Sequence, residues 1–476
     1  MSDFPGLLFE PGAYDCEWFI NDRRISGRIE LFGSKVPELT LYADVPPPVE
    51  EPNQRVYTFG RQETIKRLVG RLRSNHDVVV FDANVQWLLP ELSMGVARYA
   101  IVGAGVAATP EDTYERILLQ VTGADLLIGS SPVGSYSQPK RATASSKSTY
   151  SVTLSEERHR RWETDDGATA ITCGYDHRPL LGRYRFEVAF APVFEFTSKT
   201  PLSLEDWLSL WVEPLLQITS TAIGTPQELA WLTLYSERTS TRAAVFSSGI
   251  AQEPYQARDE TRRMIEHPPL FTFRSPEIDL PALLSSWREI KSGDNPFFEL
   301  YNAALFEPRL PQRARFLHLI QALEALHSYE SRINDKRTQR QFAARRESLL
   351  TRLEDLGLTR EDTRFLKRSW STQRRDSLDH RLRILIRSLP DAIRRKTELP
   401  QSDPVAAMLR SRGARGPEEQ LRMLRNDLSH GDRNYEEQEL RPWVNALETL
   451  CRSHVLRLLG FDPKAIELAI APEIVA

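Results

Sequence analysis

The sequence predicts a multidomain α+β protein, in which a β-rich N-terminal region is followed by an all-α helical bundle. Apolar and polar residues alternate with a period of two in much of the first half of the chain, which is typical of half-buried strands. From about residue 280 onward, apolar residues recur instead at helical spacing. The chain has 476 residues, enough for two or three domains. We expect a boundary between residues 1–295 and 296–476.

Composition is that of an ordinary globular protein, with 41% apolar and 27% charged residues. No apolar run approaches the roughly 18 residues that a membrane span needs, so we expect no membrane partner. The first residues lack the basic-then-apolar order of a secretory signal, which favours a cytoplasmic protein. Its three cysteines are far apart and fit neither a disulfide framework nor a zinc site.

Strands are predicted first in the N-terminal region. Alternation is clearest at 28–32 and 38–43, and Pro46-Pro47-Pro48 then interrupts it. Further strand-like runs lie at 78–81, 99–102, 117–121, 150–154 and 184–190. The serine-rich and basic segment 134–150 indicates a polar loop, a candidate flexible insertion.

One helix is predicted before the all-α part. Ser203 is a suitable N-cap, and apolar residues follow it at helical spacing as far as Leu216. Because proline cannot donate a backbone hydrogen bond, Pro214 should kink or end this helix.

The C-terminal part is predicted to be helical throughout. A wide apolar stripe of Phe316, Leu319, Ile320, Leu323 and Leu326 defines one long helix. Other helices are expected at 341–356, 359–370, 376–389, 403–411, 416–430 and 439–460. Short connections with Gly357, Pro390 and Gly413 separate some of them, as in an all-α bundle of roughly 180 residues.

Charge is distributed unevenly along the chain. Residues 301–476 carry 32 Lys and Arg against 25 Asp and Glu, whereas residues 1–300 carry 30 against 40. A contact with a polyanion therefore belongs to the C-terminal part, if there is one. The alternative is equally open, because arginine outnumbers lysine 52 to 10 throughout and the excess can be solvated helix surface.

Most enzyme signatures are missing from the sequence. There is no H-E-x-x-H, Cys-x-x-Cys pair, EF-hand loop or Walker motif, so we expect no metal and no cofactor. No G-x-S-x-G elbow supports a Ser/His/Asp hydrolase, although the sequence does not exclude one. Gly103-Ala104-Gly105 follows a strand as a dinucleotide fingerprint would, but Pro110 falls where its helix should continue. A nucleotide-dependent oxidoreductase is thus the last-ranked class.

Five Arg-x4-His pairs remain: Arg71/His76, Arg262/His267, Arg313/His318, Arg375/His380 and Arg425/His430. Chance alone should give roughly one such pair at this composition, so context must choose among them. The chemistry is suggestive because arginine is a permanent cation matched to phosphate, and histidine can exchange a proton near neutral pH. Together they can cut RNA without a metal.

Arg425/His430 has the most favourable context. Leu421, Leu424 and Leu428 would bury one face of its helix, and Gly431 offers a left-handed cap directly after the histidine. On an ideal helix the two side chains are roughly 140° and about 7.5 Å apart, so they would converge only in a distorted last turn. Asn426 and Asp427 could then fix the histidine tautomer or the arginine geometry.

An alternative interpretation of this segment stays open. His430 could simply complement the dipole at the helix C-terminus, with Arg425 in a salt bridge.

Three segments carry a family resemblance. The heptapeptide Arg425–Gly431, with a polar residue directly after the arginine, resembles the R-x4-6-H signature of HEPN ribonucleases. The helix Phe316–His327 resembles the helix that opens the HEPN domain of ApeA-type anti-phage proteins. Residues 11–14 and 25–31 resemble the start of the β-rich ApeA N-terminal domain.

The resemblance implies a bacterial defence protein. Its N-terminal region would sense an unknown phage component or restrain the nuclease, and its HEPN domain would cleave RNA to halt the infected cell. HEPN nucleases are usually metal-independent and often pair two domains around one cleft. We therefore expect a homodimer or a dimer-based homo-oligomer.

For the site, the resemblance implies catalysis by Arg425 and His430. His430 would act as base or acid while the RNA 2′-hydroxyl attacks, and Arg425 would stabilise the charge on the phosphate. The products would be a 2′,3′-cyclic phosphate and a 5′-hydroxyl, and structured RNAs such as tRNA are the expected substrates. Supporting roles are expected for Asn426, Asp427, Glu324 and His327.

The alternative is a HEPN module without catalytic activity, attached to a sensor, that forms oligomers or binds RNA through phosphate contacts.

Overall fold

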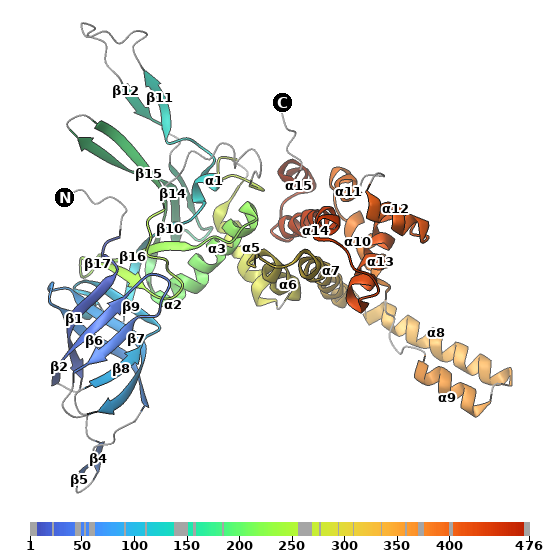
Figure 1. Ribbon diagram of the computed structural model, residues 1–476, viewed down its shortest axis with the longest axis horizontal. Helices are drawn as coiled ribbons and strands as arrows, with labels where there is room; N and C mark the ends of the chain where they lie inside the picture. The colour runs from blue at the N-terminus through green and yellow to red at the C-terminus, as the bar shows by residue number, and fades with distance from the viewer. Residues whose placement is uncertain are drawn as a thin grey trace. The chain divides into compact units, whose positions relative to one another are not determined.

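The chain forms two compact units, Met1–Ser285 and Ser286–Ala476 (Figure 1). The computed structural model describes residues 7–20, 23–42, 49–51, 54–56, 62–89, 92–109, 112–137, 151–155, 159–182, 185–255, 269–275, 278–293, 295–307, 309–334, 336–357, 359–369, 376–398 and 403–470.

Strands dominate the N-terminal unit, and 13 of those described belong to one antiparallel sheet, while β4-β5 and β11-β12 form two separate pairs. They are β1 (Gly12–Ile20), β2 (Arg23–Leu31), β3 (Glu38–Leu41), β4 (Val49–Glu51), β5 (Gln54–Val56), β6 (Gln62–Leu72), β7 (Asp77–Leu89), β8 (Leu92–Val96), β9 (Tyr99–Ala104), β10 (Thr113–Val121), β11 (Val133–Ser137), β12 (Ser151–Leu154), β13 (His159–Glu163), β14 (Thr169–Gly182), β15 (Arg185–Ser203), β16 (Leu229–Ser236) and β17 (Thr241–Phe246).

Six of these strands close into a small barrel. β7 pairs with β6 and also with β8, which completes the ring β7-β6-β1-β2-β3-β8. Alternate side chains point inward and fill it, including the buried Trp18, Ile29, Leu41, Val85 and Trp87. The inward positions explain the period of two in the sequence.

The sheet continues beyond the barrel through β9, β17, β16, β10, β15, β14 and β13. A helix packs on it, made of α2 (Leu204–Trp207), the π-helical turn η4 (Leu208–Val212) and α3 (Glu213–Ile223). Ser203 caps it, as predicted, by accepting a hydrogen bond from the backbone of Asp206. Indole Nε1 of Trp207 anchors the helix by donating to the carbonyl of Tyr114 at 3.1 Å.

Of the two outcomes predicted for Pro214, a kink or an end of the helix, the helix does not end there. Pro214 stands in the first turn of α3, directly after the π-helical turn, and the helix continues to Ile223. The π-helical turn directly before α3 changes the hydrogen-bond pattern at this point of the helix, where a proline has no N–H to donate.

The predicted loop at 134–150 is only partly described. Val133–Ser137 forms β11, which pairs with β12 and so extends as a hairpin arm. Residues 138–150 and the Pro46–Pro48 interruption lie outside the described residues.

The C-terminal unit is helical in all its described regular elements. They are α5 (Leu280–Ser292, which begins before the unit boundary), α6 (Pro296–Leu305), α7 (Gln312–Asn334), α8 (Lys336–Asp355), α9 (Arg360–Ser369), α10 (Leu378–Arg387), α11 (Asp391–Thr397), α12 (Pro404–Ser411), α13 (Pro417–His430), α14 (Glu437–Leu458) and α15 (Pro463–Ile470).

Helix α7 is the centre of this bundle and contacts α6, α10, α13 and α14. Every residue of its predicted apolar stripe, from Phe316 to Leu326, is fully buried. Leu421, Leu424 and Leu428 of α13 are buried too. The predicted fold class, a β-rich region followed by an all-α region, is therefore confirmed. Among the described helices, none combines the length and the apolar composition needed to cross a bilayer.

Candidate functional site

Helix α13 carries the predicted heptapeptide and ends where the sequence indicated. Pro417 opens the helix, and His430 is its last residue. Gly431 then adopts the left-handed conformation, with φ of +71°, and its N–H donates to the carbonyl of Asp427. Glycine adopts this conformation without a steric penalty, so the predicted C-cap is confirmed.

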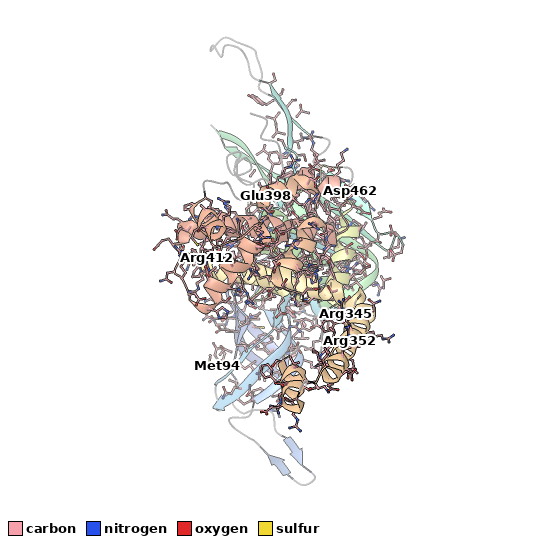
Figure 2. All side chains as sticks on the ribbon, turned by 90° about the vertical axis from the view of Figure 1, so that its right-hand side faces the viewer. Met94, Arg345, Arg352, Glu398, Arg412 and Asp462 are labelled. Atoms are coloured by element: carbon pink, nitrogen blue, oxygen red, sulfur yellow. The ribbon has the colours of Figure 1, made fainter. Side chains whose placement is uncertain are left out.

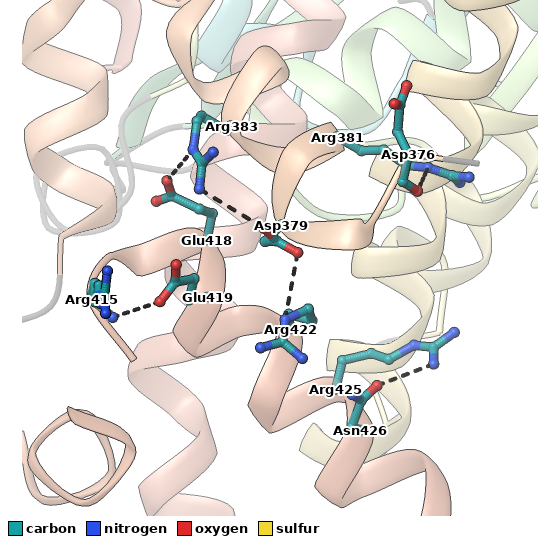
Figure 3. Close-up of polar contacts among 10 residues, drawn as sticks. All are labelled: Asp376, Asp379, Arg381, Arg383, Arg415, Glu418, Glu419, Arg422, Arg425 and Asn426. Carbon is teal, nitrogen blue, oxygen red and sulfur yellow. Dashed lines mark hydrogen bonds and ion pairs between the residues drawn. The ribbon is translucent and has the colours of Figure 1, made fainter. Parts of the chain in front are cut away.

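Arg425 lies on the side of α13 that faces α7. Its Nη2 is 4.0 Å from Oε2 of Glu324. Its Nη1 donates to Oδ1 of Asn426 at 3.4 Å, the contact that Figure 3 shows. About a third of the Arg425 side chain is exposed, at 32%. Glu324 and Asn426 therefore both lie within contact distance of the guanidinium.

His430 is exposed at the end of the same helix. Among the described residues, no hydrogen bond or ion pair joins it to Arg425. The helix stays regular to its last residue, because the N–H groups of Gly431 and Asp432 both bond to the carbonyl of Asp427. The expected convergence in a distorted last turn thus does not occur within one chain, and five helical positions leave the side chains about 140° apart.

The helix geometry gives His430 a different neighbour. Residues four positions apart share a face of a helix, so Asn426 lies on the His430 face of α13. Arg422 comes one turn earlier along this face, and its Nε is 3.5 Å from Oδ1 of Asp379 in α10 (Figure 3).

Asp427 does not touch the arginine or the histidine of the motif. Its side chain is 5% exposed and binds Arg412 through two hydrogen bonds, of 2.5 and 3.0 Å. The hydroxyl of Tyr435 donates to the same carboxylate at 2.6 Å. The expectation that Asp427 orients the histidine or arginine directly is therefore wrong, because α12 and the loop after α13 take up its oxygens.

These contacts perturb two pKa values. The hydrogen bonds from Arg412, followed by that from Tyr435, hold the pKa of Asp427 below its usual range despite burial. Burial, and then the hydrogen bond to Asp427, raises the pKa of Tyr435 to about 12. Asp427 is accordingly an anion and Tyr435 a neutral donor at neutral pH.

His327 lies three residues after Glu324 on α7 and is buried. Its Nδ1 is 3.3 Å from the hydroxyl of Ser331. Burial, reinforced by the positive charge of Arg381, lowers the pKa of His327. Glu324 reaches the arginine of the motif, whereas the described hydrogen bonds and ion pairs of His327 join it to neither Arg425 nor His430.

The sequence did not indicate three residues around this helix end. Arg412 and Tyr435 bind Asp427, and Arg313 of α7 donates from Nη2 to the carbonyl of Leu428. Tyr435 stands only five residues after His430. Its position in the polar loop that follows Gly431 was a sequence signal that could have indicated it. Arg313 belonged to a rejected Arg/His pair, and its contact depends on tertiary packing.

The other Arg/His pairs have structural roles where they are described. Arg71 bonds to Asp77 at the β6–β7 turn, and His76 bonds to Ser74. Nε2 of His380 lies 3.9 Å from Asp376, while Arg375, Arg262 and His267 lie outside the described residues.

The glycine fingerprint is not a dinucleotide site. Gly103 is in β9, which pairs antiparallel with β7 and β17, and Gly105 leads into a short 3₁₀ turn, η1 (Val106–Ala108). A Cβ on Gly103 would lie 2.3 Å from the carbonyl oxygen of Arg242, so the glycine serves strand packing. In the part of this segment that the structure describes, no α-helix follows whose N-terminus could bind the pyrophosphate.

The chain thus combines a β-rich N-terminal unit with a helical C-terminal unit that exposes a histidine at the end of a helix. Residues 14–287 match the family model described as ApeA N-terminal domain 1, so the chain belongs to this ApeA family. Membership supports an ApeA-like anti-phage defence protein. No curated protein and no solved structure matches the chain.

Proposed function

We propose that this chain is a metal-independent endoribonuclease effector of anti-phage defence, with Arg425 and His430 as its catalytic residues. Three observations support the proposal. The N-terminal unit belongs to the ApeA family, the heptapeptide of α13 resembles the HEPN signature, and His430 is exposed at a well-capped helix end. The last observation carries most weight, since a general base must reach its substrate.

In this mechanism the imidazole of His430 accepts the proton of an RNA 2′-hydroxyl. The 2′-oxygen attacks the neighbouring phosphorus, and the bond from phosphorus to the 5′-oxygen breaks. The 5′-oxygen then takes a proton from the imidazolium of His430. Arg425 stabilises the extra negative charge on the phosphate oxygens in the transition state. The chain itself thus supplies both the base and the cation.

The separation of Arg425 and His430 favours a homodimer as the active species. Two copies related by a two-fold axis present the same surface to each other, so Arg425 of one copy can be placed beside His430 of the other. The exposed end of α13 fits such a face. The β-rich unit would then sense the phage trigger and control the nuclease.

A second candidate is a non-catalytic RNA-binding or oligomerisation module. The pairing of Arg425 with Glu324 favours it, because an arginine held by a carboxylate is partly neutralised. RNA would then bind through phosphate contacts without being cut.

Expression in cells distinguishes the two candidates. If the nuclease proposal holds, the wild-type chain stops growth on infection and produces new RNA 3′ ends at defined positions. The His430→Ala and Arg425→Ala variants should neither stop growth nor produce these RNA ends. Arg415→Ala, an exposed arginine before α13, is the matched control and should behave as wild type. Toxicity of the His430→Ala variant equal to that of wild type, with no new RNA ends from either chain, would favour the non-catalytic module.

A further inference from the structure

The buried carboxylate of Asp427 joins three separate parts of the helical unit. Arg412 is the C-cap residue of α12, Asp427 is in the last turn of α13, and Tyr435 directly precedes Glu436, the N-cap of α14. The three side chains meet through hydrogen bonds of 2.5, 3.0 and 2.6 Å. We call this set, Arg412, Asp427 and Tyr435, the clasp.

The backbone of Asp427 closes the end of α13. The carbonyl of Asp427 accepts the N–H of Gly431, which closes the helix, and the N–H of Asp432 at 3.1 Å. One residue therefore fixes the last turn through its backbone and the following loop through its side chain. His430 lies inside the segment closed at both ends by these bonds.

Fixing this segment matters for an exposed side chain. His430 makes no hydrogen bond or ion pair with another described side chain, so its position depends on the backbone that carries it. A displacement of about 1 Å at a reacting group can lower a rate by as much as 100-fold. A buried anion that accepts hydrogen bonds from two side chains is a rigid anchor for such a group, since charge-assisted hydrogen bonds are short and strong.

We propose that Arg412 and Tyr435 are positioning residues for His430, acting through the carboxylate of Asp427. The inference rests on the proposed function, because it assigns these two residues to the same catalytic site. Figure 2 shows Arg412 on a different part of the helical unit from Arg345 and Arg352 of α8, which take no part in the clasp.

The conservative variants Tyr435→Phe and Arg412→Lys test the proposal. Phenylalanine keeps the ring and removes only the hydroxyl, and lysine keeps the charge but cannot bind a carboxylate through two parallel bonds. Arg415→Ala, three residues from Arg412 and outside the clasp, is the control. Thermal unfolding of each variant identifies any that fail to fold.

Two readouts follow from a positioning role. First, kcat for a defined RNA should fall about 10-fold in Tyr435→Phe with KM unchanged. When Tyr435→Phe is added to the His430→Ala variant, it should lower kcat no further. Second, the ¹³Cε1–¹H signal of His430 in labelled protein should shift or broaden in both variants but not in the control. His430→Gln assigns that signal.

The second readout does not need nuclease activity, so it separates the two proposals. If wild-type chain cuts no RNA and the His430 signal still responds to Tyr435→Phe, the clasp positions the residue and the proposed function fails. If the chain cuts RNA but kcat and the His430 signal are unchanged in folded Tyr435→Phe and Arg412→Lys, the clasp proposal is overturned and the nuclease stands.

Discussion

Nη2 of Arg425 lies 4.0 Å from Oε2 of Glu324, so the motif arginine is held against α7 and not against His430. This ion pair is partly exposed, with 32% and 23% of the two side chains accessible. In a single chain, the cation and the candidate base therefore point away from each other.

This relationship gives a first prediction, on stability and catalysis together. A double-mutant cycle of Arg425→Ala and Glu324→Ala should show a coupling in the free energy of unfolding below about 1 kcal/mol, since exposed pairs contribute little. The coupling in kcat/KM should be larger, because Glu324 orients the arginine for substrate. Urea unfolding and steady-state cleavage measure the two terms, and equal couplings would mean that the pair is only structural.

Asp427 should contribute to stability through the clasp. Replacing it with alanine leaves Arg412 and the hydroxyl of Tyr435 without their acceptor, and we expect a loss of about 1–3 kcal/mol, reduced by the partial exposure of Arg412. Chemical unfolding at pH 7 measures this loss. An unchanged unfolding midpoint would contradict the role given to the buried carboxylate.

The same carboxylate predicts a pH dependence at the acid side. Its pKa is lowered in the folded state, so its stabilisation is complete above the usual unfolded value near 3.9 and is lost as pH falls through the lower folded value. The stability difference between wild type and Asp427→Asn should therefore shrink below pH 4. A difference that stays constant down to pH 2 would be inconsistent with a lowered pKa.

His454 predicts a second source of acid lability, which acts in the same direction as that of Asp427. It is fully buried in α14, and burial, followed by the charge of Arg457, lowers its pKa to about 3. Between about pH 6.5 and 3 the unfolded chain takes up a proton that the folded chain does not, so stability falls as pH falls across this window. His454→Met should flatten that dependence. Unfolding midpoints from pH 8 to 4 compare the two chains, and parallel curves would show that His454 is not buried in its neutral form.

Salt dependence distinguishes the roles of the two motif residues in RNA binding. In the His430→Ala background, Arg425→Ala should reduce the slope of log Kd against log salt by about 0.7, the value for one phosphate contact on a single strand. Arg415→Ala should leave the slope unchanged. Fluorescence anisotropy between 50 and 300 mM salt measures it; equal slopes in all three chains would show that Arg425 does not contact phosphate.

Local patterns predicted much of the bundle. The stripe from Phe316 to Leu326 and the glycine after His430 are signals within one helix and its cap, and both have the predicted structure. Closure of the barrel could not be predicted, because β8 pairs with both β3 and β7 and such pairings depend on long-range register.

The site was predictable only in part for the same reason. Glu324 was expected from the helix that resembles a HEPN helix, and it reaches Arg425. The clasp was not expected, because Arg412 lies 15 positions before Asp427 and Tyr435 lies eight after it. Only packing of α12 and the loop after α13 brings their donors to one carboxylate.

The most direct test of the central claim is RNA cleavage by purified chain in excess EDTA. The account predicts cleavage by wild type that leaves 2′,3′-cyclic phosphate and 5′-hydroxyl ends, and a fall in rate of about 100-fold or more in Arg425→Ala and in His430→Ala. Arg415→Ala should cleave as wild type does. Full cleavage by either motif variant, or wild-type cleavage that EDTA abolishes, would contradict the account.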